Sequence, residues 1–173
     1  LTLLHGGCLC IPSEDERTNG LAVAISRMKA DWAFVTATVL DLLSPQSAPS
    51  LANLCVGGEP IRAAQIAQWE GCVHLRQTYG SSETSGVVSS RQLTIASTTK
   101  DVGKASTGVF WIVDPVDHSK LAPVGAVGEV LVEGPILGRE YINEPDKTAA
   151  TFIKAPCWRA SFEENTQLLP RLY

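Results

Sequence analysis

The chain has 173 residues, which suits one domain or a large part of one. Hydrophobic residues make up 45% of it and charged residues 18%, the balance of a globular protein with a real core. A net charge of -4 provides no basic surface for nucleic acid or an anionic membrane. No apolar run approaches membrane-spanning length, so we expect neither a nucleic-acid nor a membrane partner.

The cysteines indicate the compartment. They are odd in number, and none forms a Cys-x-x-Cys pair: Cys8, Cys10, Cys55, Cys72 and Cys157. Three lie in apolar, strand-like runs, where a thiol behaves as a small hydrophobe. We therefore predict no disulfide framework or zinc site, and a reducing, cytoplasmic setting. Because the chain starts with Leu1 rather than Met, we also expect a segment or a processed product.

Short strands and helices alternate over the first half. Ser13 precedes three acidic residues, which predicts a capping box and a helix as far as Met28 that Gly20 weakens without ending. Thr38 is predicted to cap a second helix through Leu43, and a third covers residues 61–69. The predicted strands are residues 8–11, 32–35, 53–56 and 73–76. This alternation is typical of a parallel sheet with helices on its faces.

The character changes near residue 87. Predicted strands at 87–88, 109–113 and 129–133 are separated by turns rich in glycine and proline, as in an antiparallel sheet or distorted barrel. A last short helix is expected at 146–153. We therefore divide the chain into an α/β unit at about 1–86, an antiparallel β unit at about 87–155 and an irregular tail at 156–173.

Two loops follow predicted parallel strands, at the sheet edge where open α/β proteins bind ligands. One is Gly57-Gly58-Glu59 and the other is residues 78–84, Thr-Tyr-Gly-Ser-Ser-Glu-Thr. Glycines let a base or phosphate approach the backbone, a tyrosine ring can stack on a purine, and a glutamate suits Mg²⁺. Each loop also has a purely structural interpretation, as a tight turn or a helix cap, and spacing alone leaves both open.

The amino-acid sequences of several segments decide between these interpretations. The run Leu4–Arg17, LHGGCLCIPSEDER, resembles adenylation domains of fungal-type nonribosomal peptide synthetases. Three further segments follow in the order of that family: VGGE at 56–59, YGSSE at 79–83 and VGAVGEVLVEGP at 124–135, the last of which is continued by YINEPDKT at 141–148. The resemblance implies part of the large N-terminal subdomain of an adenylate-forming enzyme.

The family's reaction is attack of an amino-acid carboxylate on the α-phosphate of ATP with Mg²⁺, which gives aminoacyl-AMP and pyrophosphate. The acyl group then passes to phosphopantetheine on a neighbouring peptidyl carrier domain. The resemblance thus implies ATP and Mg²⁺ as cofactors, and an amino acid, a carrier domain and further synthetase modules as partners. Such chemistry depends on positioning and charge neutralisation.

The resemblance also assigns site residues. Tyr79 would stack on adenine, and Ser82 and Glu83 would be catalytic, contacting the α-phosphate and holding Mg²⁺ respectively. The nucleotide would be bound by Gly57, Gly58, Glu59, Thr78, Tyr79 and Gly80. The amino-acid pocket would be lined by Phe34, Cys55, Gly57, Thr78, Gly86 and Val87, of which Phe34, Cys55 and Val87 have core packing as an alternative role.

Four positions depart from the family pattern. Ser81 replaces a proline and Gln77 an asparagine, Thr36-Ala37-Thr38 replaces Thr-Pro-Ser, and Glu140 replaces a glycine, which predicts backbone strain at Glu140 if φ is positive there. The family's phosphate loop, pocket aspartate, Thr-Gly-Asp motif and C-terminal lysine domain are not found, and residues 158–170 look unlike the family.

We therefore expect a piece of an amino-acid-activating domain that is inactive on its own. Two alternatives stay open at this point. One is another adenylate-forming enzyme, such as an acyl-CoA ligase or a carboxylate reductase-like protein, and the other is a non-catalytic remnant that serves as a binding or scaffold module.

Overall fold

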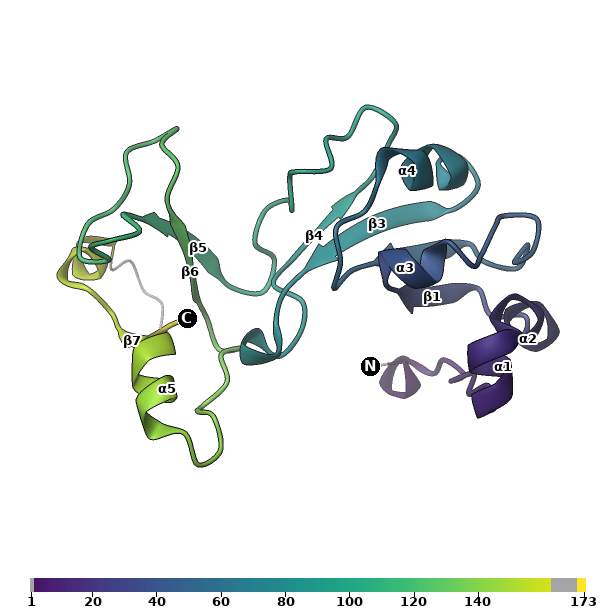
Figure 1. Ribbon diagram of the computed structural model, residues 1–173, viewed down its shortest axis with the longest axis horizontal. Coiled ribbons are helices and arrows are strands. Elements are labelled where there is room, and N and C mark those ends of the chain that lie inside the picture. Colours follow the sequence, from purple (N-terminus) through teal and green to yellow (C-terminus); the bar gives the residue numbers. More distant parts are fainter. Residues whose placement is uncertain (1, 163–170) are drawn as a thin grey trace. The chain divides into compact units, whose positions relative to one another are not determined.

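The computed structural model describes residues 2–162 and 171–173 of the chain and divides them into two compact units (Figure 1). The first comprises Leu1–Thr78 with Arg91–Val102, and the second comprises Tyr79–Ser90 with Gly103–Tyr173. Each is described by itself below.

The first unit is built on a parallel sheet. Strands β1 (Trp32–Val35), β2 (Asn53–Val56) and β3 (His74–Tyr79) lie side by side in parallel register, with Phe34 opposite Cys55 and Cys55 opposite Arg76. Strand β4 (Ser89–Gln92) follows β3 in the sheet order. The carboxyl ends of β1, β2 and β3 therefore meet at one edge of the sheet, as predicted.

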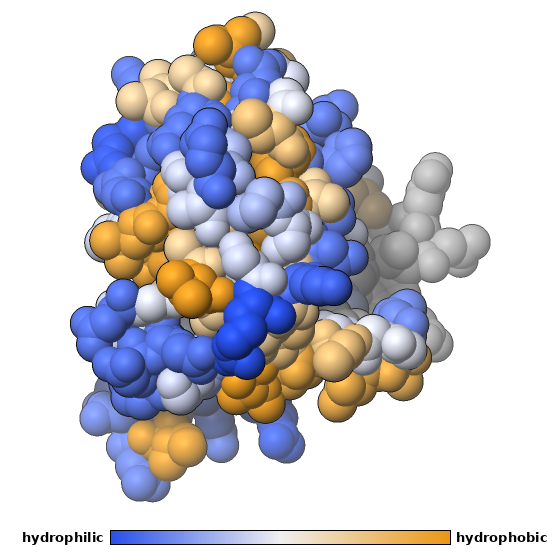
Figure 2. All heavy atoms as spheres, turned by 90° about the vertical axis from the view of Figure 1, so that its right-hand side faces the viewer, coloured by the Kyte–Doolittle hydropathy of each residue, from blue (hydrophilic) through white to orange (hydrophobic). Residues whose placement is uncertain are grey.

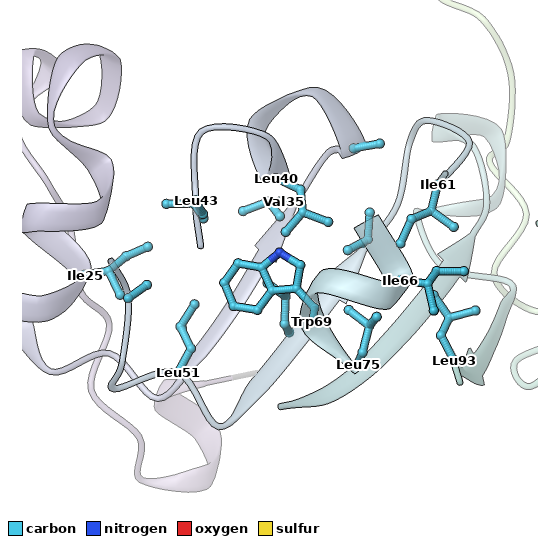
Figure 3. Close-up of a cluster of buried hydrophobic side chains, with 14 residues drawn as sticks. Ile25, Val35, Leu40, Leu43, Leu51, Ile61, Ile66, Trp69, Leu75 and Leu93 are labelled. Atoms are coloured by element: carbon cyan, nitrogen blue, oxygen red, sulfur yellow. The ribbon is translucent and has the colours of Figure 1, made fainter. Parts of the chain in front are cut away.

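Helices cover one face of this sheet. Helix α3 (Ala37–Leu40) follows β1, and α4 (Ala63–Trp69) connects β2 to β3. The fully buried indole of Trp69 lies in one cluster with Leu40, Ile66 and Leu75 (Figure 3). Burying side chains of this size stabilises the fold by roughly 1.5–3 kcal/mol each, so this cluster fixes the frame that carries the strand ends.

The N-terminal helices confirm one expectation and correct another. Ser13 forms the predicted capping box, because its Oγ accepts from the Glu16 amide at 3.2 Å while the Glu16 carboxylate accepts from the Ser13 amide at 2.9 Å. The prediction of a single helix as far as Met28 was wrong. Gly20, with φ of -142°, separates α1 (Glu14–Asn19) from α2 (Leu21–Met28), because glycine readily leaves helical geometry.

Other boundaries also differ. Residues 8–11 form no strand, and Cys8 is exposed. Thr36, not Thr38, caps α3, and its Oγ1 accepts from the Val39 amide at 3.3 Å; the helix ends at Leu40 rather than at Leu43. Strand β4 begins at Ser89, so the predicted strand at 87–88 was also wrong.

The second unit contains the predicted antiparallel pair. Strands β5 (Val109–Val113) and β6 (Glu129–Glu133) have the expected bounds and pair in antiparallel register. The last helix is α5 (Pro145–Thr151), and the short β7 (Ile153–Lys154) pairs with β8 (Arg171–Leu172). A 3-10 helix covers Cys157–Phe162, and residues 163–170 of the unusual tail lie outside the described residues.

A small second core holds this unit together. Val113, Leu131 and Leu172 are buried in it, with Trp111 and Trp158 packed against them. On the face shown in Figure 2, which belongs to the first unit, hydrophobic and hydrophilic residues are interspersed over the surface. No helix in the described residues is long and apolar enough to cross a membrane.

Candidate functional site

The predicted site residues fall into two groups, one in each unit. Phe34, Cys55, Thr78 and the segment Gly57–Glu59 belong to the first unit. Tyr79, Gly80, Ser82, Glu83, Gly86 and Val87 belong to the second.

In the first unit, three of the proposed pocket residues meet at the strand ends. A Cβ on Gly57 would lie 2.3 Å from Thr78 Oγ1 and 3.1 Å from Phe34 Cζ. The Thr78 hydroxyl also donates to the carbonyl of Val56 at 3.4 Å. Only glycine fits between these side chains, so residues from three separate strands or strand ends are brought together as the parallel topology predicted.

The exposed fractions of the proposed pocket residues show which of them lie at the surface and which in the core. Phe34 is 49% exposed and Val87 39%, so neither is an ordinary core residue. Cys55 is 9% exposed, and burial raises the pKa of its thiol while the nearby Arg76 opposes that shift. Cys55 therefore stays a neutral, compact side chain.

Glu59 has a clear local partner. Its Oε2 accepts a hydrogen bond from the Thr38 amide at 2.7 Å, at the N-terminus of α3. Hydrogen bonds from Thr38, with a smaller one from the Thr36 hydroxyl, lower the pKa of the Glu59 carboxyl. The carboxylate thus ties the loop after β2 to the first turn of α3, where orphan amides favour an anion.

In the second unit, the loop after β3 closes tightly on itself. The Val88 amide donates to the Tyr79 carbonyl at 2.8 Å, and the Gly86 amide donates to the Ser81 carbonyl at 2.9 Å. Tyr79 is 44% exposed, and its ring packs edge-to-face on Phe110 with centroids 6.2 Å apart. The exposed ring is thereby held from one side.

Ser81 explains one departure from the family pattern. Its backbone amide donates to Thr84 Oγ1 at 3.0 Å, and the Thr84 hydroxyl lies 3.0 Å from the Ser81 carbonyl. A proline has no amide hydrogen, so this capping arrangement needs a residue other than proline. It begins the 3-10 turn Ser82–Thr84 (η2), which leaves Ser82 exposed and Glu83 partly exposed.

Glu83 is held by a residue far away in sequence. The Tyr141 hydroxyl donates to Glu83 Oε1, and this bond is the largest cause that lowers the pKa of the Glu83 carboxyl. Lesser contributions come from its own backbone and from the hydroxyls of Ser81 and Tyr173. The group is therefore anionic near neutral pH.

Gln77 explains a second departure. It is buried, and its Oε1 accepts from Arg91 Nη2 at 2.9 Å and from Nε at 3.2 Å. Arg91 also binds Asp101 at 3.2 Å. Gln77 therefore has a charged partner on β4 beside its own strand.

The remaining departures cause no strain. Ala37 occupies the first position of α3, which tolerates residues other than proline. The strain expected at Glu140 was wrong, because the described non-glycine residues with positive φ are Lys29, Ser85 and Asn143. Sequence reasoning gave no role to Tyr141 or Arg91; only the motif around Tyr141 pointed to that region.

Other candidate sites carry less chemistry. A surface hollow lined by Cys72, His74 and Gln92 lies at the amino ends of β2 and β3, opposite the strand ends that bear the predicted site. No cluster of three or more His, Cys, Asp or Glu side chains suited to a metal occurs within residues 2–162 and 171–173. All five cysteines, which lie in this range, are free thiols.

A comparison with known families now identifies the chain. The model of the family described as AMP-binding enzyme matches residues 1–142. The chain belongs to the AMP-binding enzyme family. This confirms the relationship inferred from the four ordered motifs.

Curated relatives within this family are fungal synthetases. The chain is 44% identical over 158 residues to N-benzoylphenylalaninol synthetase apmA of Penicillium brevicompactum, covering 91% of this chain and 7% of that protein. It is 43% identical over 174 residues to nonribosomal peptide synthetase lenA of Aspergillus lentulus, covering 100% of this chain and 4% of that protein. The chain thus spans a small part of the length of the relatives it matches.

Solved structures confirm the fold class. PA1221, described as a synthetase protein containing adenylation and PCP domains, aligns over 99% of this chain and 35% of its own, with a TM-score of 0.75 and 24% identity. The artificially fused adenylation-PCP protein NpsA-ThdA from Klebsiella oxytoca aligns over 99% and 32%, with a TM-score of 0.74 and 19% identity. This AMP-binding chain therefore has the fold of part of an adenylation domain.

Proposed function

We propose that the chain is part of an amino-acid-activating domain that forms aminoacyl-AMP from ATP and loads it onto a carrier domain. The observation that carries this proposal is the anionic Glu83, held by Tyr141 in an exposed loop of a chain that belongs to the AMP-binding enzyme family. The fungal synthetases it resembles, and the adenylation-PCP proteins with its fold, supply the substrate class and the carrier.

The Glu83 site fits Mg²⁺. Magnesium prefers hard oxygen ligands and usually binds through one or two carboxylates, with waters and substrate phosphates completing its shell. One accessible, anionic glutamate in a loop meets that requirement. When bound, the ion would neutralise charge on the phosphates of ATP.

The chain's own residues would do the rest by positioning. Tyr79 presents an exposed ring, braced by Phe110, on which adenine stacks. The exposed hydroxyl of Ser82 donates to the α-phosphate. Gly58 leaves the backbone open near the nucleotide, Gly80 allows the tight closure of the loop that would bind it, and Glu59 supports this region by fixing the loop after β2.

The amino acid would contact the strand ends of the first unit. Phe34, Gly57 and Thr78 meet there, and the buried Cys55 lies beside Phe34 in register. Phe34 and Thr78 offer an apolar ring and a hydroxyl to the amino-acid side chain, while Gly57, which has no Cβ, lets these two side chains pack closely against its backbone. Gly86 and Val87 are the other residues proposed to contact the amino acid, and Val87 is exposed.

We propose a cytoplasmic setting for the whole protein, supported by its five free thiols. Its partners would be the amino acid, a phosphopantetheine-bearing carrier domain and neighbouring synthetase modules. The 173-residue chain alone is proposed to be inactive, since it spans 7% or less of the two synthetases compared above.

Pyrophosphate exchange tests this function. The chain is expressed within its full natural reading frame, and incorporation of labelled pyrophosphate into ATP is measured with amino acids and with aryl or fatty acids. We expect exchange that requires an amino acid. Exchange only with aryl or fatty acids would favour an acyl-CoA ligase-like activity instead, and its complete absence would favour a non-catalytic module.

Glu83→Ala is the matched site variant, and Glu140→Ala, at an exposed position, is its control. We expect the first to abolish amino-acid-dependent exchange and the second to leave it within about twofold, as surface substitutions usually do. Exchange by Glu83→Ala with unchanged Mg²⁺ dependence would refute the assignment of Glu83.

A further inference from the structure

The 3-10 turn that carries Glu83 is attached at three points to the segment 136–141 of the same unit. The Ser85 hydroxyl donates to the Ile136 carbonyl at 2.7 Å, and the Gly138 amide donates to the Glu83 carbonyl at 2.6 Å. The third point is the Tyr141 hydroxyl on the Glu83 carboxylate. The Gly138 bond joins the two backbones, the Ser85 bond joins a side chain to a backbone carbonyl, and only the third bond reaches the carboxylate itself.

The Tyr141 side chain is held in place by contacts other than its hydrogen bond to Glu83. Its amide donates to Thr148 Oγ1 at 3.0 Å, and its ring packs on Phe152 with centroids 5.7 Å apart. The Lys147 ammonium lies 4.2 Å from the ring centroid. Helix α5 and the residue after it therefore hold the ring, so that the hydroxyl is a preorganised donor rather than a mobile one.

The two segments are closely packed beside this contact, because a Cβ on Gly138 would lie 3.3 Å from the Glu83 carbonyl oxygen. A charge-assisted hydrogen bond to one carboxylate oxygen limits rotation of the whole group, because the two oxygens of a carboxylate turn together. The hydrogen bond from Tyr141 therefore restricts the orientation of Glu83.

We propose that Tyr141 is a positioning residue for the activation reaction: its hydroxyl fixes the orientation in which the Glu83 carboxylate meets the magnesium–nucleotide. This inference rests on the function proposed above. Ligand geometry is decisive for Mg²⁺, which tolerates little departure from octahedral coordination, so a carboxylate free to rotate binds it more weakly. Tyr141 acts through Glu83 and does not itself touch the nucleotide.

ATP affinity, measured by calorimetry without amino acid, tests this proposal on the protein expressed in its natural reading frame. The quantity compared is the gain in affinity between low and saturating Mg²⁺. We expect Tyr141→Phe, which keeps the ring contacts, to reduce that gain by roughly 3- to 10-fold. This is less than a hydrogen bond to a charged group usually contributes, because the hydroxyls of Ser81 and Tyr173 remain as partners of the carboxylate. ATP affinity at low Mg²⁺ should not change.

Ser85→Ala is the matched control, because it removes a bond between the same two segments without touching the carboxylate. We expect it to keep the Mg²⁺-dependent gain. In the background of Glu83→Gln, Tyr141→Phe should have no further effect, since the residues act as one pair. A further loss of similar size there would mean that Tyr141 acts only on general structure, which overturns the proposal.

The two proposals fail differently. If Glu83→Gln removes the Mg²⁺-dependent gain while Tyr141→Phe leaves it unchanged, the positioning role is refuted and the proposed function stands. If Glu83→Gln leaves the gain unchanged, Glu83 is not the metal ligand, and both its assignment and the positioning role of Tyr141 fall, while the proposed function is still decided by the exchange assay. Thermal unfolding by circular dichroism checks that each variant is folded like the parent.

Discussion

Gly80 and Gly86 approach each other so closely that a Cβ on Gly80 would lie 1.5 Å from the Gly86 carbonyl oxygen. The same hypothetical atom would lie 3.0 Å from the Val88 amide nitrogen. This contact closes the loop that presents Ser82 and Glu83. The glycine in the Tyr-Gly pair is therefore required by the packing of the loop as well as by any approach of a nucleotide.

Gly80→Ala is accordingly expected to be severely destabilising. The added methyl cannot fit without opening the loop, so we expect a loss of about 3 kcal/mol or more in the free energy of unfolding, measured by urea denaturation. Gly125→Ala is the control, because Gly125 has φ of +85° and a Cβ there would meet nothing within 4 Å. It should lose only about 1 kcal/mol, the cost of a left-handed conformation. Equal losses would contradict the close contact.

The buried pair of Glu133 and Arg159 makes a second prediction. Arg159 Nε lies 3.0 and 2.8 Å from the two Glu133 oxygens, and Trp111 Nε1 donates to Oε2 at 2.7 Å. Both side chains are largely buried, at 3% exposure for Glu133 and 12% for Arg159. Arg159→Met should therefore cost about 3–5 kcal/mol of unfolding free energy, because it leaves a buried carboxylate without its cation.

The control for that prediction is Arg17→Met, which breaks the ion pair between the exposed side chains of Arg17 and Glu14. Such a pair is worth about 0–1 kcal/mol, so urea denaturation should detect little change. If both variants lose the same small amount, the Glu133–Arg159 pair does not anchor the 3-10 helix Cys157–Phe162 to β6.

Gln77 allows the family's asparagine to be tested at this position. Gln77→Asn withdraws the amide by one methylene from Arg91, which leaves the buried polar group poorly paired. We expect a loss of about 1–3 kcal/mol in unfolding free energy. Gln92→Asn, at an exposed position of β4, should stay within about 0.5 kcal/mol. A neutral Gln77→Asn would show that the Arg91 contact carries no stability.

The lowered pKa of Asp117 leads to a prediction about how folding stability changes in acid. Hydrogen bonds from Lys120 and then from Ser119 lower the pKa of its carboxyl from 3.8 to about 2. A depressed folded-state pKa contributes stability that is present above the ordinary value and is lost as pH falls toward about 2. Asp117→Asn should therefore flatten the decline in stability between these pH values, measured by thermal unfolding across that range. An unchanged profile would contradict the assignment.

The local sequence predicted those elements in which an apolar run is bounded by turn-forming residues such as glycine and proline. Strands β5 and β6 have the predicted bounds because their apolar runs are framed by glycine and proline, and β2 ends where Gly57-Gly58 follows it. The Ser13 capping box also needs only residues three apart. Residues 8–11 lie between Gly7 and Pro12 in the same way but form no strand, because an apolar run becomes a strand only when a neighbour supplies hydrogen bonds.

The loops that follow β2 and β3 were found from the sequence, through ordered motifs and the rule for parallel strands. What the sequence could not show is which side chains meet there. Tyr141 reaches Glu83 across 58 positions, and Gly57 separates Phe34 from Thr78 between three strand ends. Contacts of this kind depend on how distant segments pack, which no local periodicity records. The sequence thus determined the family and the site loops, and tertiary packing decided how Glu83 is held.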